Sequence, residues 1–263
     1  MTFKQRSSWK ITRAVIFALI LREMRSKFGG RRFGFFWIFF EPVAHIALIM
    51  TILHFRGRTI IEGIEFPVYL LSGMVPFFMM RGIMFKGMEA VNANMALFSY
   101  KQIKPIDTIV ARAIIELVLS ACIYVILLLG LGFWFDNPIA IERPLRWIGV
   151  LFIGFMLAFS VAVNFCLLID AFPDIKTFIR LLSFPLYLLS GVIFPLFLLP
   201  QEVVSWLLWN PLVHIIDELR YSVFEHYPVH TGVNLEYPIR VTVVLLLVGL
   251  ALYRQRRLKL VSR

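Results

Sequence analysis

Glu41 and His45 have the spacing of a polar pair inside an otherwise apolar run. They lie four positions apart, so a helix would place both side chains on the same face. Glu41 lies nine positions after Arg32, which is about 13 Å along a helix at 1.5 Å per residue. An ionisable residue at this depth of a bilayer is costly and typical of a polar transport path. A buried pair that only fixes helix packing is the alternative.

Side chains suited to catalysis are present but scattered over several apolar runs. They are Glu41, His45, His54, Asn164 and Asp170. Their dispersal does not favour an enzyme embedded in a membrane. The sequence also lacks GxxxxGK followed by Ser or Thr, the loop that holds nucleotide phosphates, and it lacks HExxH, GxSxG and paired cysteines. We therefore expect no directly bound cofactor and no metal site, and energy from ATP would have to come from another polypeptide.

Residues 89–105 form a mixed aromatic and basic segment between two apolar runs. Its polar and aromatic members include Asn92, Asn94, Phe98, Tyr100, Lys101, Gln102 and Lys104. In a transporter driven by a separate motor protein, a short cytoplasmic helix must transmit force by lodging in a groove of that motor. The segment therefore predicts a motor-docking role, and an ordinary solvated loop is the alternative.

The elements that carry these residues are predicted to be membrane-spanning helices. Of the 263 residues 60% are hydrophobic and 16% are charged, which is unusual for a soluble domain. A helix of about 20 apolar residues crosses a bilayer core of roughly 30 Å, and the apolar runs allow six such spans. We place them at residues 33–53, 66–85, 106–133, 147–169, 177–199 and 239–253.

Two further segments are too short or too polar to span. Residues 8–27 carry basic residues at both ends of a run of eight apolar residues, which predicts a helix lying in the membrane interface; a disordered basic tail is the alternative. Residues 201–230 contain Trp206, Trp209 and Pro211, which favours two short interfacial or re-entrant helices. The expected fold class is thus an all-α membrane protein with six transmembrane helices in a single domain, residues 1–263.

The distribution of Lys and Arg predicts the orientation in the membrane. One side of the six predicted spans carries 21 of the 27 Lys and Arg residues, and the other side carries six. Because positive residues are retained in the cytoplasm, both termini are expected to lie there. The net charge of +11 does not indicate nucleic-acid binding, since the cations lie at the borders of apolar runs.

Ordered motifs at both ends of the chain resemble a known family. The run LREMRSKFGGRRFGFFWIFFEP from Leu21 to Pro42 is similar to the opening of the ABC-2 type permeases, particularly the capsular polysaccharide exporters. There an interface helix containing RE is followed by Arg, Gly, an aromatic stretch and EP. The strings SGVIFPLFLLP from Ser190 and WNPLVHIIDELR from Trp209 are similar to the last periplasmic segment of that family. The resemblance covers essentially the whole chain.

The resemblance implies a homodimeric permease of the bacterial inner membrane. Two copies of a cytoplasmic ATPase, which binds ATP and Mg, would drive the export of a lipid-linked capsular polysaccharide. Export proteins in the periplasm and outer membrane would be further partners, and residues 92–104 would be the coupling helix. An ABC-2 type exporter of O-antigen, another glycolipid, a drug or a small lipid is the alternative.

Two clusters before the Glu41 and His45 pair suit such a glycolipid substrate. The cations come first and are Arg25, Lys27, Arg31 and Arg32. The aromatic residues follow and are Phe33, Phe35, Phe36, Trp37, Phe39 and Phe40. The cations would attract the phosphate of a lipid head group, and the aromatic faces would stack on sugar rings. Membrane anchoring by the cations and lipid-facing aromatic residues are the alternatives.

Overall fold

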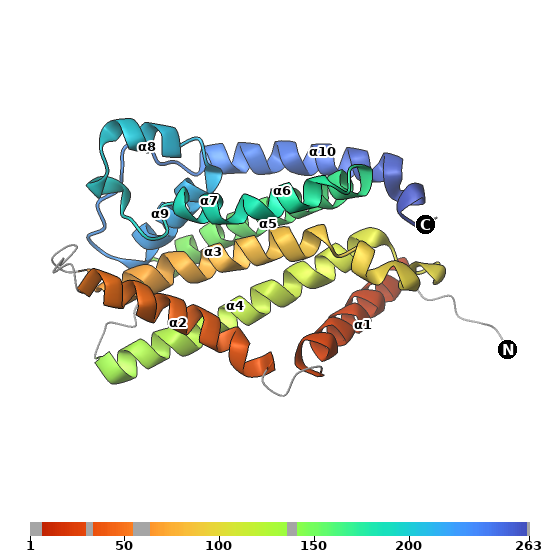
Figure 1. Cartoon of the computed structure of the whole chain (residues 1–263), viewed down its shortest axis with the longest axis horizontal. Coiled ribbons are helices and arrows are strands. Elements are labelled where there is room, and N and C mark those ends of the chain that lie inside the picture. The colour runs from red at the N-terminus through yellow and green to blue at the C-terminus, as the bar shows by residue number, and fades with distance from the viewer. Residues whose placement is uncertain (1–6, 30–33, 55–63, 136–140, 262–263) are drawn as a thin grey trace.

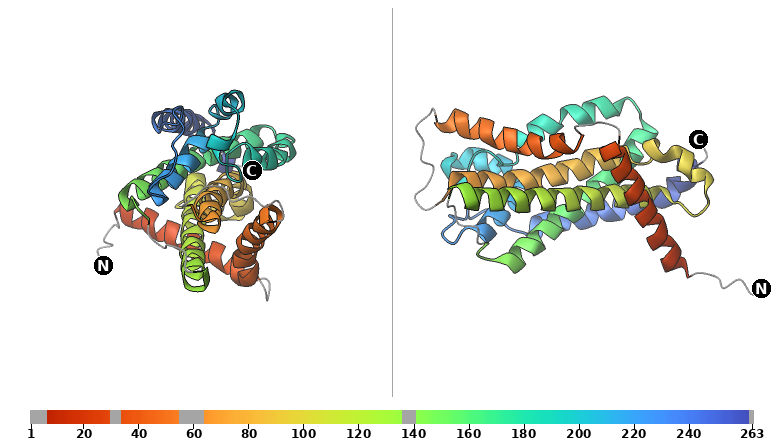
Figure 2. Two further views of the ribbon diagram at one scale, coloured as in Figure 1. Left: turned by 90° about the vertical axis from the view of Figure 1, so that its left-hand side faces the viewer. Right: turned by 90° about the horizontal axis from the view of Figure 1, so that it is seen from below.

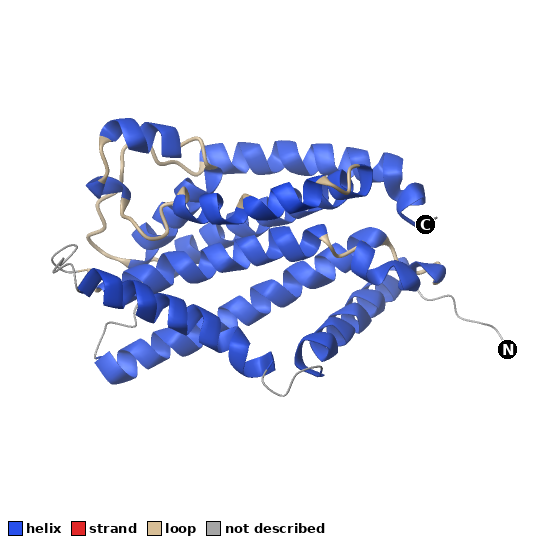
Figure 3. Cartoon of the chain, in the orientation of Figure 1, coloured by secondary structure: helices blue, strands red, loops and turns tan. Residues whose placement is uncertain are grey.

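The computed structural model describes residues 7–29, 34–54, 64–135 and 141–261, and within these ranges it contains helices and no strands (Figure 3). Four of the described helices are long and apolar enough to cross a membrane. They are α3 (Phe66–Met88), α4 (Pro105–Phe135), α5 (Pro144–Ala171) and α10 (Glu236–Val261). All four run along the long axis of the molecule (Figure 1), as a membrane bundle requires.

Helix α3 is the central helix of the bundle. It packs against α4, α5 and α9, and α5 in turn packs against α10. In an apolar 18-residue stretch of α3, 78% of the residues are buried inside the protein, compared with 17% in the corresponding stretch of α10. Pro67 stands in the first turn of α3, where a missing N–H leaves no helical hydrogen bond unmade. The outer helices therefore expose apolar side chains on a surface that a bilayer would cover.

Two helices precede the central bundle. Helix α1 (Ser8–Gly29) contains the helix predicted over residues 8–27, and it crosses the long axis and packs on α4 (Figure 2). Helix α2 (Gly34–His54) includes Pro42 and packs on α3. It coincides with the first predicted span, except that Phe33 lies outside the described residues.

The fifth predicted span, residues 177–199, is not one continuous helix. The chain instead forms α6 (Ile175–Leu181), α7 (Ser183–Leu188) and the 3-10 helix η2 (Leu196–Leu198). Pro185 interrupts the hydrogen-bond ladder between α6 and α7, because proline has no N–H and its ring crowds the preceding turn. Gly191 then turns the chain with a φ of 67°, a conformation that glycine adopts without steric cost.

The last part of the chain also differs in length from the expectation. Helix α10 is 26 residues long and extends beyond both ends of the predicted span at residues 239–253. Its C-terminal extension is rich in Arg and Lys, which are good helix formers. Between α7 and α10, two short helices occur as predicted for residues 201–230: α8 (Gln201–Leu207) and α9 (Pro211–Val223). The Asn210 side chain caps α9 by accepting from the Leu212 amide.

Arg220 on α9 ties together the end of the bundle that contains α8 and α9. Its side chain is 1% exposed, and its guanidinium donates to the carbonyl oxygens of Gly191 and Val192. The same guanidinium lies 3.8 Å above the ring of Tyr69 on α3, a favourable cation–π geometry. One arginine thus joins α3, α9 and the turn after α7.

The close approach of Arg220 requires glycine at position 73 of α3. A Cβ atom at Gly73 would lie 2.5 Å from Nη2 of Arg220. We predict that Gly73→Ala displaces the guanidinium and lowers the free energy of unfolding by about 1–3 kcal/mol, the usual range for overpacking. The measurement is thermal unfolding of the purified protein in detergent.

Gly149→Ala on α5 is the matched control, because apart from the adjacent residues and the backbone of its own helix no atom lies within 4 Å of a Cβ atom there. It should leave the melting temperature unchanged or raise it slightly, since alanine favours helix. Equal melting temperatures for the Gly73→Ala variant and the wild type would contradict the proposed packing.

Candidate functional site

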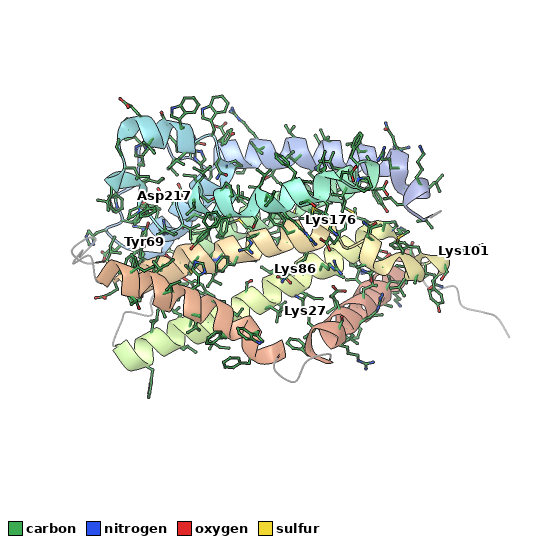
Figure 4. The ribbon with its side chains drawn as sticks, viewed as in Figure 1. Lys27, Tyr69, Lys86, Lys101, Lys176 and Asp217 are labelled. Carbon is green, nitrogen blue, oxygen red and sulfur yellow. The ribbon has the colours of Figure 1, made fainter. Side chains whose placement is uncertain are left out.

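The predicted docking segment has one exposed face and one buried face. Its core is the 3-10 helix η1 (Asn92–Ser99), which follows α3. Tyr100 is 65% exposed, and Lys101 and Lys104 are also exposed; Lys101 lies at the extremity of the bundle (Figure 4). Phe98 is only 6% exposed and belongs to the hydrophobic core. A partner protein could therefore contact Tyr100 and Lys101, whereas Phe98 anchors the segment.

Asn94 connects η1 to α1. Its side chain is buried, and its amide group donates to the carbonyl oxygen of Ala90 at 2.7 Å. Its Oδ1 atom accepts a hydrogen bond from Nη1 of Arg22 on α1, also at 2.7 Å. A hydrogen bond to a charged donor is among the stronger ones in proteins. This hydrogen bond links η1 to α1.

Glu116 on α4 is the centre of a charged network that includes residues of α1 and α3. It is 7% exposed, and its carboxylate accepts from Nζ of Lys27 on α1 and from Nζ of Lys86 on α3, the latter at 2.8 Å. Burial lowers the pKa of Lys27 and outweighs the attraction of Glu116, which acts in the opposite direction. The Glu116 carboxylate is therefore what favours a charged lysine here.

Three further ion pairs belong to the network, and two of them extend it to α6. Glu23 on α1 pairs with Arg112 on α4 at 2.7 Å. Glu89, next to the C-terminal end of α3, pairs with Arg180 and, at 3.3 Å, with Lys176, both on α6. Helices α1, α3, α4 and α6 are thus linked by charge around one cavity of about 300 Å³. Lys27, Lys86 and Lys176 lie in the same part of the bundle in Figure 4.

The predicted basic cluster is divided in the structure. Arg25 is exposed on α1, in keeping with a role at the membrane surface. Lys27 points into the bundle and is held by Glu116, so its charge is already balanced by a carboxylate. Arg31 and Arg32 lie outside the described residues.

The aromatic residues of α2 form an exposed patch. Phe36, Trp37 and Phe40 are all exposed, and their rings contact one another with centroids 5.1–6.3 Å apart. The patch therefore faces away from the core of this chain and towards lipid, substrate or a partner. Of the other predicted members, Phe33 is outside the described residues and the side chains of Phe35 and Phe39 are not described.

Of the polar pair Glu41 and His45 on α2, only the His45 side chain is described in the structure. Nε2 of His45 lies 3.0 Å from the hydroxyl oxygen of Tyr187 on α7, and the His45 ring contacts Phe78 edge-on. The Glu41 side chain lies outside the described part, so its pairing with His45 stays a prediction. Asn164, considered above as a scattered polar residue, donates to carbonyl oxygens of Ser160 and Leu245 and thereby joins α5 to α10.

Glu116 and Arg220 are the residues whose roles were missed from sequence. Glu116 lies in the middle of the third predicted span, where a lone carboxylate is itself a signal that cationic partners exist. Asp217 and Arg220 are three positions apart on α9, so they share a face, and both are buried. Asp217 accepts a hydrogen bond from the Tyr227 hydroxyl at 2.6 Å.

The chain that forms this bundle, with its transverse N-terminal helix and protruding η1 segment, also has a clear sequence match to a known family. Residues 14–224 match the ABC-2 type transporter family, and the chain belongs to that family. Proteins of this family are the membrane components of transporters that a partner ATPase drives.

Three relatives cover nearly the whole chain. The polysialic acid transport protein KpsM of Escherichia coli is 37% identical over 254 residues, which is 95% of this chain and 96% of the relative. The capsule polysaccharide export inner-membrane protein BexB of Haemophilus influenzae is 28% identical over 96% of this chain and 94% of its own length. The capsule polysaccharide export inner-membrane protein CtrC of Neisseria meningitidis serogroup A is 28% identical over 92% of this chain and 90% of its own length.

The charged network predicts a stability cost for neutralising its central carboxylate. We expect Glu116→Gln to leave Lys27 without its balancing charge and to lower the free energy of unfolding by about 2 kcal/mol, because hydrogen bonds to charged groups are of this strength. Thermal unfolding in detergent measures the effect. The control is Glu142→Gln, since Glu142 is exposed. Equal stability of both variants would show that the network contributes nothing to folding.

Proposed function

We propose that this chain is the transmembrane permease subunit of an ATP-driven exporter that moves a lipid-linked capsular polysaccharide across the bacterial inner membrane. The observation that carries the proposal is the 37% identity to KpsM over 95% of the chain. BexB and CtrC, whose names describe capsule export at the inner membrane, support the same substrate class. A cytoplasmic ATPase in two copies would bind ATP and Mg, and the permease would act as a homodimer.

In this proposal the chain crosses the membrane six times. Helices α3, α4, α5 and α10 meet the length and hydropathy requirement. The apolar helix α2 would be another span, and the broken pair α6 and α7 would complete the six. The excess of Lys and Arg on one side supports cytoplasmic termini; in this orientation α1 would lie in the membrane interface and α8 and α9 near the periplasm.

The docking segment would couple the permease to the ATPase. Tyr100 and Lys101 are exposed next to η1 and are suited to a groove with an apolar floor and an acidic rim. A displacement of η1 would reach α1 through the hydrogen bond between Arg22 and Asn94. From α1 the displacement would reach α3, α4 and α6 through the charged network. A single displacement of η1 would therefore shift several helices.

The aromatic patch of α2 and the polar pair Glu41 and His45 would line the substrate path. A lipid-linked glycan presents both apolar and hydroxyl-rich surfaces. Exposed aromatic rings suit the apolar faces of sugars, and Arg25 together with Arg31 and Arg32 would attract the lipid phosphate. Export proteins of the periplasm and outer membrane would receive the polymer.

Deletion of the gene in its own bacterium tests the substrate class. The proposal predicts that capsular polysaccharide accumulates inside the cell and disappears from the surface, and that a plasmid copy restores surface capsule. Polysaccharide-specific antibody on intact and permeabilised cells measures both pools. Normal surface capsule in the deletion strain would assign the chain to another exporter.

The two faces of the docking segment predict different defects for two aromatic residues. Tyr100→Ala should reduce transport-dependent ATP hydrolysis roughly tenfold, as expected for loss of an interface hot spot, with normal amounts of membrane-inserted protein. Phe98→Ala should instead destabilise the permease by about 3 kcal/mol, because it removes a buried aromatic ring. ATPase activity normalised to inserted permease separates the two results. Full activity of the Tyr100→Ala variant would exclude a docking role for this residue.

The orientation can be tested by labelling introduced cysteines with a membrane-impermeant thiol reagent. Thr231→Cys should react in whole cells, whereas Lys101→Cys should react only after permeabilisation. Cys122 and Cys166 are free thiols in the native chain, so the background should carry serine at both positions. The reverse labelling pattern would overturn the orientation.

A further inference from the structure

An apolar groove of about 640 Å³ runs along the side of the bundle. It lies between α3, α5, the α6 and α7 segment and α10, and its lining includes Leu157, Val161, Phe165, Leu186 and Leu245. Trp206 and Trp209 stand at the end of the groove near α8 and are largely exposed. Tryptophan side chains are typical of the membrane interface, so the apolar lining between them and the other end of the groove lies at the depth of lipid hydrocarbon chains.

The charged cavity described above is the immediate neighbour of this groove. Phe85 on α3 lines both spaces, and Ile179 in the groove is followed in sequence by Arg180 in the cavity. Four cations and three carboxylates line the cavity, and Lys176 pairs with Glu89 at its edge. The site therefore has a net positive charge.

Three cations in or beside the cavity have N–H donors that their ion pairs do not use. The side chains of Lys86, Lys176 and Arg180 are 39–55% exposed. Lysine has three N–H donors and arginine has five, whereas the bonds to Glu116 and Glu89 use only some of them. The remaining donors can bind the oxygens of an added anion.

We propose that the two spaces together form a binding site for an anionic phospholipid of the surrounding bilayer. The phosphate and its charged head group occupy the cavity, where Lys86, Lys176 and Arg180 donate to its oxygens, and an acyl chain occupies the groove. Basic pockets between transmembrane helices on the cytoplasmic side are suited to anionic head groups. The occupied site connects α3 to α6 and stabilises the broken α6 and α7 segment against α5.

Native mass spectrometry of the full-length permease in detergent tests the charged half of the site. Titration with phosphatidylglycerol should give a bound lipid with about tenfold higher affinity than phosphatidylcholine. The double variant Lys176→Ala, Arg180→Ala should bind both lipids equally weakly. Arg254→Ala on α10, an exposed arginine outside the cavity, should keep the preference of the wild type.

The apolar half is tested by filling the groove. Val161→Phe should weaken the binding of phosphatidylglycerol, whereas Leu247→Phe on the exposed side of α10 should not. Circular dichroism of each variant in detergent shows whether it is folded before its titration is scored. Lack of preference for phosphatidylglycerol in the wild type, or wild-type binding by the charge variant, would overturn the proposal. Recovery of lipid-linked glycan in place of phospholipid from the purified wild type would overturn it as well.

Discussion

The carboxylate of Glu116 needs cationic partners because it lies inside a bundle of apolar helices, where an unpaired charge is costly. Lys27 and Lys86 satisfy it from two different helices. This requirement holds the transverse helix α1 against α4 and joins α3 to the same carboxylate, and the neighbouring pairs at Glu23 and Glu89 bring Arg112 and α6 into the same network. The protruding segment η1 is attached to this arrangement through Arg22 and Asn94, which is the connection that the proposed coupling to an ATPase would use.

The same constraint shapes the opposite end of the molecule. Arg220 is buried, its two terminal guanidinium nitrogens donate to two backbone carbonyl groups, and the guanidinium lies over the face of Tyr69. Those carbonyl groups are available only because the chain turns at Gly191 and leaves the helical path after α7. The interruption of the α6 and α7 segment is thus matched to a specific cation on α9.

Long apolar runs made the helices predictable, but contacts between distant residues could not be read from the chain. Helices α3, α4 and α5 include the predicted spans because nearly uninterrupted apolar sequence favours one helix. The break at Pro185 and Gly191 was missed, since hydropathy does not distinguish a kinked segment from a straight one. Lys27 was expected at the membrane surface because its partner Glu116 is 89 positions away. Phe98 and Tyr100 were both selected from the sequence as docking residues, but the sequence could not show that Phe98 is buried and Tyr100 exposed.

A double-mutant cycle between Arg22 and Asn94 tests the link between docking and transport most directly. The quantity is the rate of ATP-driven export per inserted permease for Arg22→Ala, Asn94→Ala and the double variant. If the hydrogen bond between these residues transmits the movement of η1, the double variant should be no more defective than either single variant. Independent, additive losses would contradict the account, because they would show that the two residues act separately.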